Sequence, residues 1–245
     1  MMKKFILIAC MIQQTMNIQS QSVQYTGGGY GNFFVGPSYL SIPTLHEYLK
    51  EEQILGASAS YNAISTMIGG EGFGMKGRFI IGGGGFGSGP INVASPKGKA
   101  EINAGGGYFK TGYVLIPGKA AFFATHLGIG WGGYSVKITN NTPDQEIYFN
   151  PAKPAIPLDI RNYYFGGTIF DPGVSVQTIA FGDTQENSSG GFMLGIHMGC
   201  IITIPLGDWY SGTDMVLGYI PLPGVLYNPY LKITIGGGGM EYKTY

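Results

Sequence analysis

Two histidines, His126 and His197, have the clearest capacity for chemistry, and each lies on the small-residue side of an alternating apolar stretch. Two imidazoles that met inside one fold could bind a metal ion or supply the base of a hydrolase acting on lipid. Neither stretch holds a nearby Asp or Glu, and the spacing singles out no Ser partner. Filling of the protein interior is therefore the leading interpretation of both histidines. We expect no catalytic residue, no metal site and no cofactor, with His126 and His197 as the candidates for any site.

A G-x-G-x-x-G match at residues 82–87 has the spacing of a nucleotide-binding loop. That use requires a helix directly afterwards to hold the phosphates, but Pro90 and a polar stretch follow instead. Glycine runs also recur at residues 105–107 and 236–239. Structural glycine, which permits kinks and close strand packing in a small barrel, is therefore the favoured interpretation.

His197 belongs to a long stretch, residues 191–206, in which every second residue from Phe192 is apolar. A period of two predicts a β-strand with one apolar face, because successive side chains of a strand point to opposite sides. Soluble strands usually have about 5–6 residues, whereas a strand that crosses a bilayer needs about 9–11. Residues 120–139, around His126, alternate in the same way. The side chains predicted to face lipid are Phe123, Leu127, Ile129, Trp131, Phe192, Leu194, Ile196, Met198, Cys200, Ile202, Ile204 and Leu206.

The rest of the chain contains further strand-like stretches, at residues 30–42, 57–70, 73–87, 99–116, 162–181 and 230–245. Glu71-Gly72 is the predicted tight turn between two of them. Asp171-Pro172-Gly173 interrupts residues 162–181 as either a bulge or a hairpin turn. A bulge gives about eight strands in a barrel, and a hairpin gives about ten, with part of residues 213–220 forming a strand.

The predicted connections are long after the first, third, fifth and seventh strands and short after the others. Outer-membrane barrels show this alternation, with short periplasmic turns and longer extracellular loops. The long connections include residues 140–161 and 208–228, which are rich in proline or glycine. In the first long connection, a capping box predicts one short helix over residues 44–55.

The composition is that of a lipid-facing barrel. Glycine accounts for 43 of the 245 residues and charged residues for only 11%, against averages of about 7% and 25%. Lys and Arg together number 14, as do Asp and Glu. This balance lacks the basic character of a nucleic-acid-binding protein. The predicted role of Glu71, Lys76, Arg78, Glu101, Lys110 and Lys232 is to carry charge in the lumen or at the rim, where ion pairs among them would plug the barrel.

Residues 1–20 have the features of a secretory signal peptide, with Lys3 and Lys4 before a short apolar core. An alternative is a lipoprotein signal, in which Cys10 is lipidated instead of removed. Removal of the leader would leave Cys200 as the remaining cysteine, so no intrachain disulfide would form. No apolar run after the leader is long enough for a transmembrane helix.

These features together resemble small outer-membrane β-barrel proteins of Gram-negative-type bacteria. The resemblance covers most of the mature chain as architecture and includes the aromatic C-terminal Tyr245. Such families end in a strand with apolar residues at alternating positions, which Glu241 and Lys243 do not match. A bulge in residues 236–239 would shift the register and put Met240 and Tyr242 on the apolar face.

The sequence thus predicts a single-domain, antiparallel, up-and-down transmembrane β-barrel over residues 21–245, located in the outer membrane. We expect a non-enzymatic structural or accessory role, contact with outer-membrane lipid, and loops that engage another outer-membrane or periplasmic protein. The alternatives are a lipid-modifying enzyme, a narrow pore, and a soluble barrel that binds an apolar ligand. The last predicts apolar residues inside and polar residues outside.

Overall fold

The computed structural model describes residues 23–45, 47, 64–94, 98–140, 159–207, 209–211 and 224–244. The predicted signal peptide with Cys10, the terminal Tyr245, and most of the connections 140–161 and 208–228 lie outside these residues.

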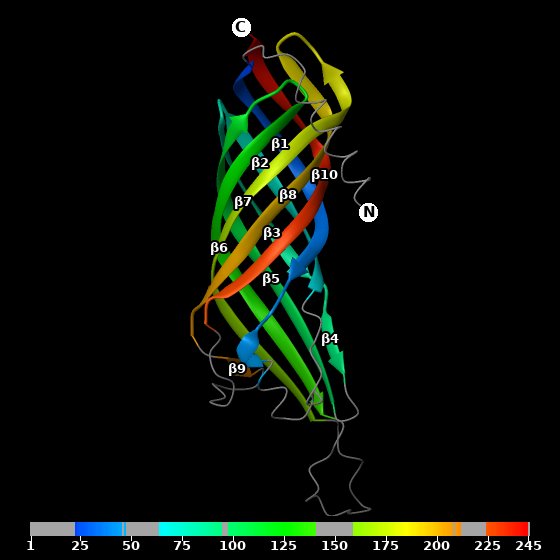
Figure 1. Cartoon of the computed structure of the whole chain (residues 1–245), viewed down its shortest axis with the longest axis vertical. Coiled ribbons are helices and arrows are strands. Elements are labelled where there is room, and N and C mark those ends of the chain that lie inside the picture. Colours follow the sequence, from blue (N-terminus) through cyan, green and yellow to red (C-terminus); the bar gives the residue numbers. More distant parts are fainter. Residues whose placement is uncertain are drawn as a thin grey trace, which may run out of the picture.

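The described chain forms one antiparallel sheet that closes on itself (Figure 1). Its strands are β1 (Val23–Tyr39), β2 (Ile64–Lys76), β3 (Phe79–Ser88), β4 (Ile91–Ala94), β5 (Gly98–Ile116), β6 (Ala121–Asn140), β7 (Asp159–Thr184), β8 (Ser188–Pro205), β9 (Tyr210–Ser211) and β10 (Leu226–Thr244). The closed ring runs β1–β2–β3–β5–β6–β7–β8–β10 and returns to β1. The short β4 pairs with β5 beyond the end of β3, and β9 pairs with β7. The predicted all-β, antiparallel, up-and-down barrel of about eight strands is confirmed.

The stretch Asp171-Pro172-Gly173 is neither a hairpin nor a bulge, because β7 passes straight through it. Phe170 pairs with Ile202 and Gly173 with Gly199, in one unbroken register. The register shift of β7 against β8 lies instead between Ile179 and Phe181. Within the described chain, the ring therefore keeps β7 as a single strand.

The predicted turn at Glu71-Gly72 is wrong. Strand β2 continues to Lys76, and the turn to β3 is formed by Gly77 and Arg78, with a φ of 59° at Gly77. A two-residue hairpin needs positive φ in this place, which glycine adopts without steric cost. The prediction failed because Gly72 breaks the apolar alternation without breaking the strand. A similar difference occurs in the polar stretch after Pro90, which lies outside the predicted strands: residues 91–94 form β4.

The predicted bulge in residues 236–239 is also wrong. Strand β10 keeps one register against β8 from Leu226–Thr203 to Glu241–Ser188. Met240 and Tyr242 are consequently buried inside the barrel rather than placed on its outer apolar face. On its other side, β10 pairs with β1, and the bulge of that pairing lies in β1, between Tyr25 and Gly27.

Short and long connections occupy opposite ends of the barrel, as predicted. The connections at 77–78, 117–120 and 185–187 lie at one end, together with the start of β1 and the end of β10, where Val23 pairs with Thr244. Strands β4 and β9 mark the long-connection end (Figure 1). Within the predicted helix, residues 44, 45 and 47 are helical, and the remainder lies outside the described residues. No helix in the described part of the chain is long and apolar enough to cross a membrane.

Candidate functional site: a charged layer inside the barrel

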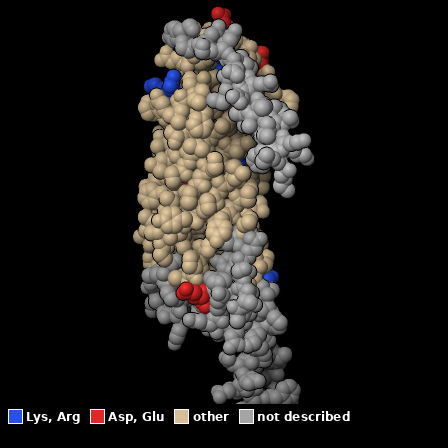
Figure 2. Space-filling model, in the orientation of Figure 1, with Lys and Arg blue, Asp and Glu red and all other residues tan. Residues whose placement is uncertain are grey.

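The outer face of the barrel is apolar in its central part. None of the twelve side chains predicted to face lipid is buried, and Trp131 and Met198 are 58% and 59% exposed. Cys200 is partly exposed and unpaired. Figure 2 shows Lys, Arg, Asp and Glu concentrated toward the two ends of the molecule, with other residues covering the middle.

The charged side chains of the central barrel point inward. Among the described residues, those buried in the lumen are Glu71 of β2, Lys110 of β5, Asp171 of β7 and Lys232 of β10. The remaining charged side chains that the structure describes lie at or near strand ends or in connections. This polarity is the reverse of that of a water-soluble barrel, whose charges face solvent.

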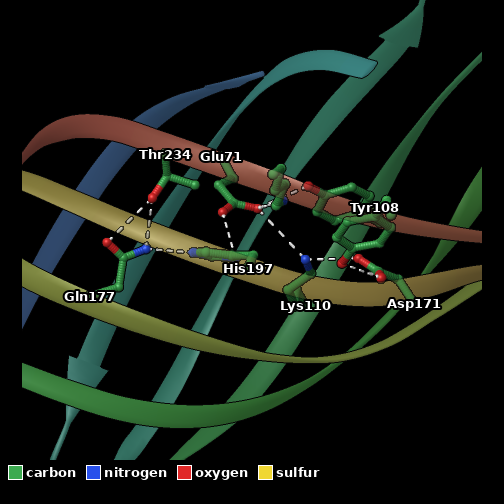
Figure 3. Close-up of polar contacts among 9 residues, drawn as sticks. Glu71, Tyr108, Lys110, Asp171, Gln177, His197 and Thr234 are labelled. Carbon is green, nitrogen blue, oxygen red and sulfur yellow. Dashed lines mark hydrogen bonds and ion pairs between the residues drawn. The ribbon is translucent and has the colours of Figure 1, made fainter. Parts of the chain in front are cut away.

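Glu71 and Lys110 connect these charges into one network (Figure 3). The Lys232 Nζ lies 2.8 Å from Glu71 Oε2, and the Lys110 Nζ lies 3.6 Å from the same oxygen. Lys110 also contacts Asp171 Oδ2 at 2.8 Å. Two carboxylates therefore face two ammonium groups, and the layer is electrically balanced. Such balance is needed because an unpaired charge buried away from water is strongly destabilising.

Two tyrosines supply further hydrogen bonds to the carboxylates. Tyr108 Oη donates to Glu71 Oε2 at 3.0 Å, and Tyr230 Oη donates to Asp171 Oδ1 at 2.7 Å. The Lys110 ammonium lies 4.4 Å from the centre of the Tyr108 ring, which places a cation over an aromatic face. These contacts hold the charged side chains in fixed positions across the lumen.

His197 extends the network toward a neutral polar pair. Its Nδ1 lies 3.4 Å from Glu71 Oε1, and its Nε2 lies 2.5 Å from Gln177 Nε2. The Gln177 amide also donates to Thr234 Oγ1 at 3.2 Å. With the amide nitrogen as donor to Nε2, the proton of a neutral His197 resides on Nδ1 and faces the Glu71 carboxylate. The chain of contacts thus crosses from β2 through β8 and β7 to β10.

His126 and His197, the two residues singled out in the sequence, meet inside the barrel. Their ring centres are 5.7 Å apart. His126 Nε2 is buried without a hydrogen-bond partner in the described structure. Within the described residues, no group of three or more His, Cys, Asp or Glu side chains could hold a metal ion. Both imidazoles are part of the packed polar layer in the lumen.

Inward-facing glycines make room for these side chains. A Cβ added at Gly195 would clash with the Gln177 amide and the Thr234 hydroxyl. A Cβ at Gly199 would clash with the Tyr230 hydroxyl. The packing of Gln177, Thr234 and Tyr230 inside the eight-stranded lumen therefore depends on these two glycines.

Apolar layers cover the charged layer on both sides. Buried side chains of these layers flank the charged residues: Met67 and Phe73 lie on either side of Glu71 in β2, Tyr108 and Val114 on either side of Lys110 in β5, and Tyr230 and Met240 on either side of Lys232 in β10. A third apolar cluster, including Tyr134, Phe165 and Trp209, fills the long-connection end. Between Ser38, Phe86 and Asn228 there is a cavity of about 10 Å³, room for about one water.

Three members of the layer, Asp171, Gln177 and Thr234, are not predicted from the sequence. Asp171 resembled a turn residue because proline and glycine follow it. Gln177 and Thr234 carried a usable signal, since each is a polar residue at an inward position of an alternating strand. Of the charges predicted for lumen or rim, Glu71, Lys110 and Lys232 lie in the lumen. Lys76, Arg78 and Glu101 lie at the ends of the barrel.

The sequence matches no protein family profile and no curated protein. Among solved structures, the outer membrane protease OmpT from Escherichia coli is similar at 11% identity, covering 93% of this chain and 98% of its own, with a TM-score of 0.31. A mutant of the TodX monoaromatic hydrocarbon channel is similar at 7% identity, covering 94% of this chain and 92% of its own, with a TM-score of 0.20. These values are low, so the barrel architecture rests on the strand pairings themselves. In that architecture, the chain resembles outer-membrane barrels without sharing a motif with them.

Proposed function

We propose that this protein is a sealed outer-membrane barrel with a non-enzymatic structural or accessory role. The observation that carries the proposal is the inverted polarity of the central barrel. Buried charges occupy the lumen, while large apolar side chains such as Phe33, 80% exposed, cover the outside. Exposing such a surface to water would be unfavourable, whereas contact with lipid acyl chains keeps it in an apolar environment.

The layered lumen favours a sealed barrel over the alternative of a narrow pore. Ions would have to cross the apolar layers on either side of the charged layer, and these layers are packed with aromatic and aliphatic side chains. The same inward packing weighs against a soluble carrier of an apolar ligand, because its binding residues would have to line an open interior.

We propose that partner contacts are made at the long-connection end. There β5, β6 and β7 extend past β3, and an apolar core around Trp209 packs against them. Such a core gives the connections a folded base from which to engage another protein of the outer membrane. A periplasmic partner would instead meet the short-turn end.

The membrane claim is tested by gel mobility of the purified full chain with and without boiling. A closed barrel resists SDS until heated, because its backbone groups are paired around the ring. We expect a heat-dependent shift, and dye-loaded vesicles containing the protein should leak no faster than empty ones. A protein that stays in the soluble fraction without a shift would contradict the membrane claim, and rapid leakage would contradict the sealed lumen.

The enzyme alternative is tested by lipid analysis of cells that produce His126→Ala or His197→Ala variants. We expect lipid profiles identical to those of the wild type, because both imidazoles are enclosed by packed side chains. A lipid species lost in either variant, with the heat-dependent shift retained, would favour a lipid-modifying enzyme.

A further inference from the structure

Two opposite hairpins at the short-turn end carry charges of opposite sign. Lys76 and Arg78 lie at the β2–β3 turn, and Asp183 and Glu186 lie at the β7–β8 turn. In the ring, two strands separate these hairpins on either side, so they face each other across the barrel. Figure 2 shows basic side chains on one flank of this end and acidic side chains on the other. At this end of the barrel, the other charged residues that the structure describes are Lys119, Glu241 and Lys243.

The β2–β3 turn holds its two cations in a defined place. Lys76 and Phe79 are paired directly across the two-residue turn. Gly77 provides the left-handed backbone conformation, and the Arg78 carbonyl accepts a hydrogen bond of 2.8 Å from the Val114 amide. The turn is therefore tied to β5 as well as to its own hairpin. Both cationic side chains are exposed.

An aromatic pair lies immediately beside these cations on the outer face. Phe79 is paired with Tyr113 of β5, and their rings meet edge to face with centres 5.3 Å apart. The two side chains are 67% and 37% exposed. Aromatic rings of this kind occupy the boundary between hydrocarbon and headgroups in membrane proteins. Lys76 and Arg78 consequently sit where lipid phosphates would lie.

We propose that Lys76 and Arg78 bind the phosphate of an anionic phospholipid of the phosphatidylglycerol class, while Phe79 and Tyr113 contact its glycerol and upper acyl region. The inference rests on the proposed membrane location. Cations near an anionic lipid surface each strengthen binding by about five-fold. The acidic β7–β8 hairpin has a similar exposed aromatic pair, Phe181 and Phe192, but repels such a headgroup. Anionic lipid therefore gathers on one side of the barrel.

The test compares lipid retention by native mass spectrometry after folding the full chain into mixed phosphatidylglycerol and phosphatidylcholine. The wild type should retain phosphatidylglycerol preferentially. The Lys76→Gln/Arg78→Gln variant should lose this preference by about ten-fold or more. The matched control, Lys99→Gln/Lys137→Gln, removes two cations from the long-connection end and should behave as the wild type. Equal loss in both variants, or no loss in either, would overturn the proposal.

Two further measurements separate the possible failures. A heat-dependent gel shift of the wild type together with an unchanged lipid preference in the β2–β3 variant would overturn the lipid site and leave the membrane barrel standing. A wild type without the gel shift would overturn both. Millimolar inorganic phosphate should not displace the retained lipid, and displacement would mean that the turn binds free phosphate instead.

Discussion

At the scale of single residues, the lumen of this barrel is organised around the Glu71 carboxylate. It contacts Lys232, Lys110, His197 and Tyr108, which come from three different strands, β10, β5 and β8. No single sequence segment shows this arrangement, because Lys232 lies 161 positions from Glu71. The sequence predicts only that both residues lie in the lumen or at the rim of the barrel. The contact between Glu71 and Lys232 follows only from the closure of the ring between β1 and β10.

Removal of the central carboxylate should be strongly destabilising. In Glu71→Gln, two buried lysines would share the single remaining carboxylate of Asp171, and we expect the free energy of unfolding to fall by about 3–5 kcal/mol. The measurement is urea-dependent unfolding in phospholipid vesicles.

The control for that experiment is Glu101→Gln. The Glu101 side chain is 33% exposed and lies 3.9 Å from Lys99, so its loss should change the unfolding free energy by less than about 1 kcal/mol. Similar losses in the two variants would contradict the account of a buried network.

The inward and outward glycines should respond differently to an added methyl group. At Gly195, the methyl group would displace Gln177 and Thr234, with an expected loss of about 1–3 kcal/mol in unfolding free energy. At Gly72, nothing lies within 4 Å of the new Cβ, so Gly72→Ala should be neutral or stabilising by up to about 1 kcal/mol. The same urea titration measures both, and a reversed order would contradict the assigned facing of β2 and β8.

At the scale of elements, glycine explains where prediction from sequence succeeded and where it failed. The alternation of residues 191–206 was long and regular enough to place β8 and the outward direction of its apolar side chains. In β2 and β10, by contrast, consecutive glycines remove the alternation. The sequence therefore predicts a turn at Glu71-Gly72 and a bulge at residues 236–239, and both predictions are wrong. The backbone pairings run through both places without interruption.

The β2–β3 turn provides a test at this scale. With a φ of 59° at Gly77, a β-branched residue is disfavoured, and Gly77→Val should reduce the unfolding free energy by about 1–2 kcal/mol. Gly77→Asn should cost much less, because asparagine tolerates the left-handed conformation. The comparison uses vesicle unfolding of the two variants. Equal costs would mean that the turn does not constrain this φ.

At the scale of the whole molecule, the barrel is a stack of layers within an apolar shell. An apolar cluster at the short-turn end, the charged layer, and two apolar clusters toward the long connections follow one another along the lumen. Composition and periodicity were sufficient to predict the shell and the barrel. The layering was out of reach, because it depends on the register by which eight strands bring distant residues to one level.

The central claim, that the outer face contacts lipid while the lumen is packed, is tested most directly by the two tryptophans of the chain. Trp131 is 58% exposed on the outer face, and Trp209 is 1% exposed inside. The Trp209→Phe variant isolates Trp131, and Trp131→Phe isolates Trp209. In vesicles of brominated phosphatidylcholine, the fluorescence of Trp131 should be strongly quenched and that of Trp209 should not. Trp131 fluorescence that is quenched by aqueous iodide but not by brominated lipid would contradict the account.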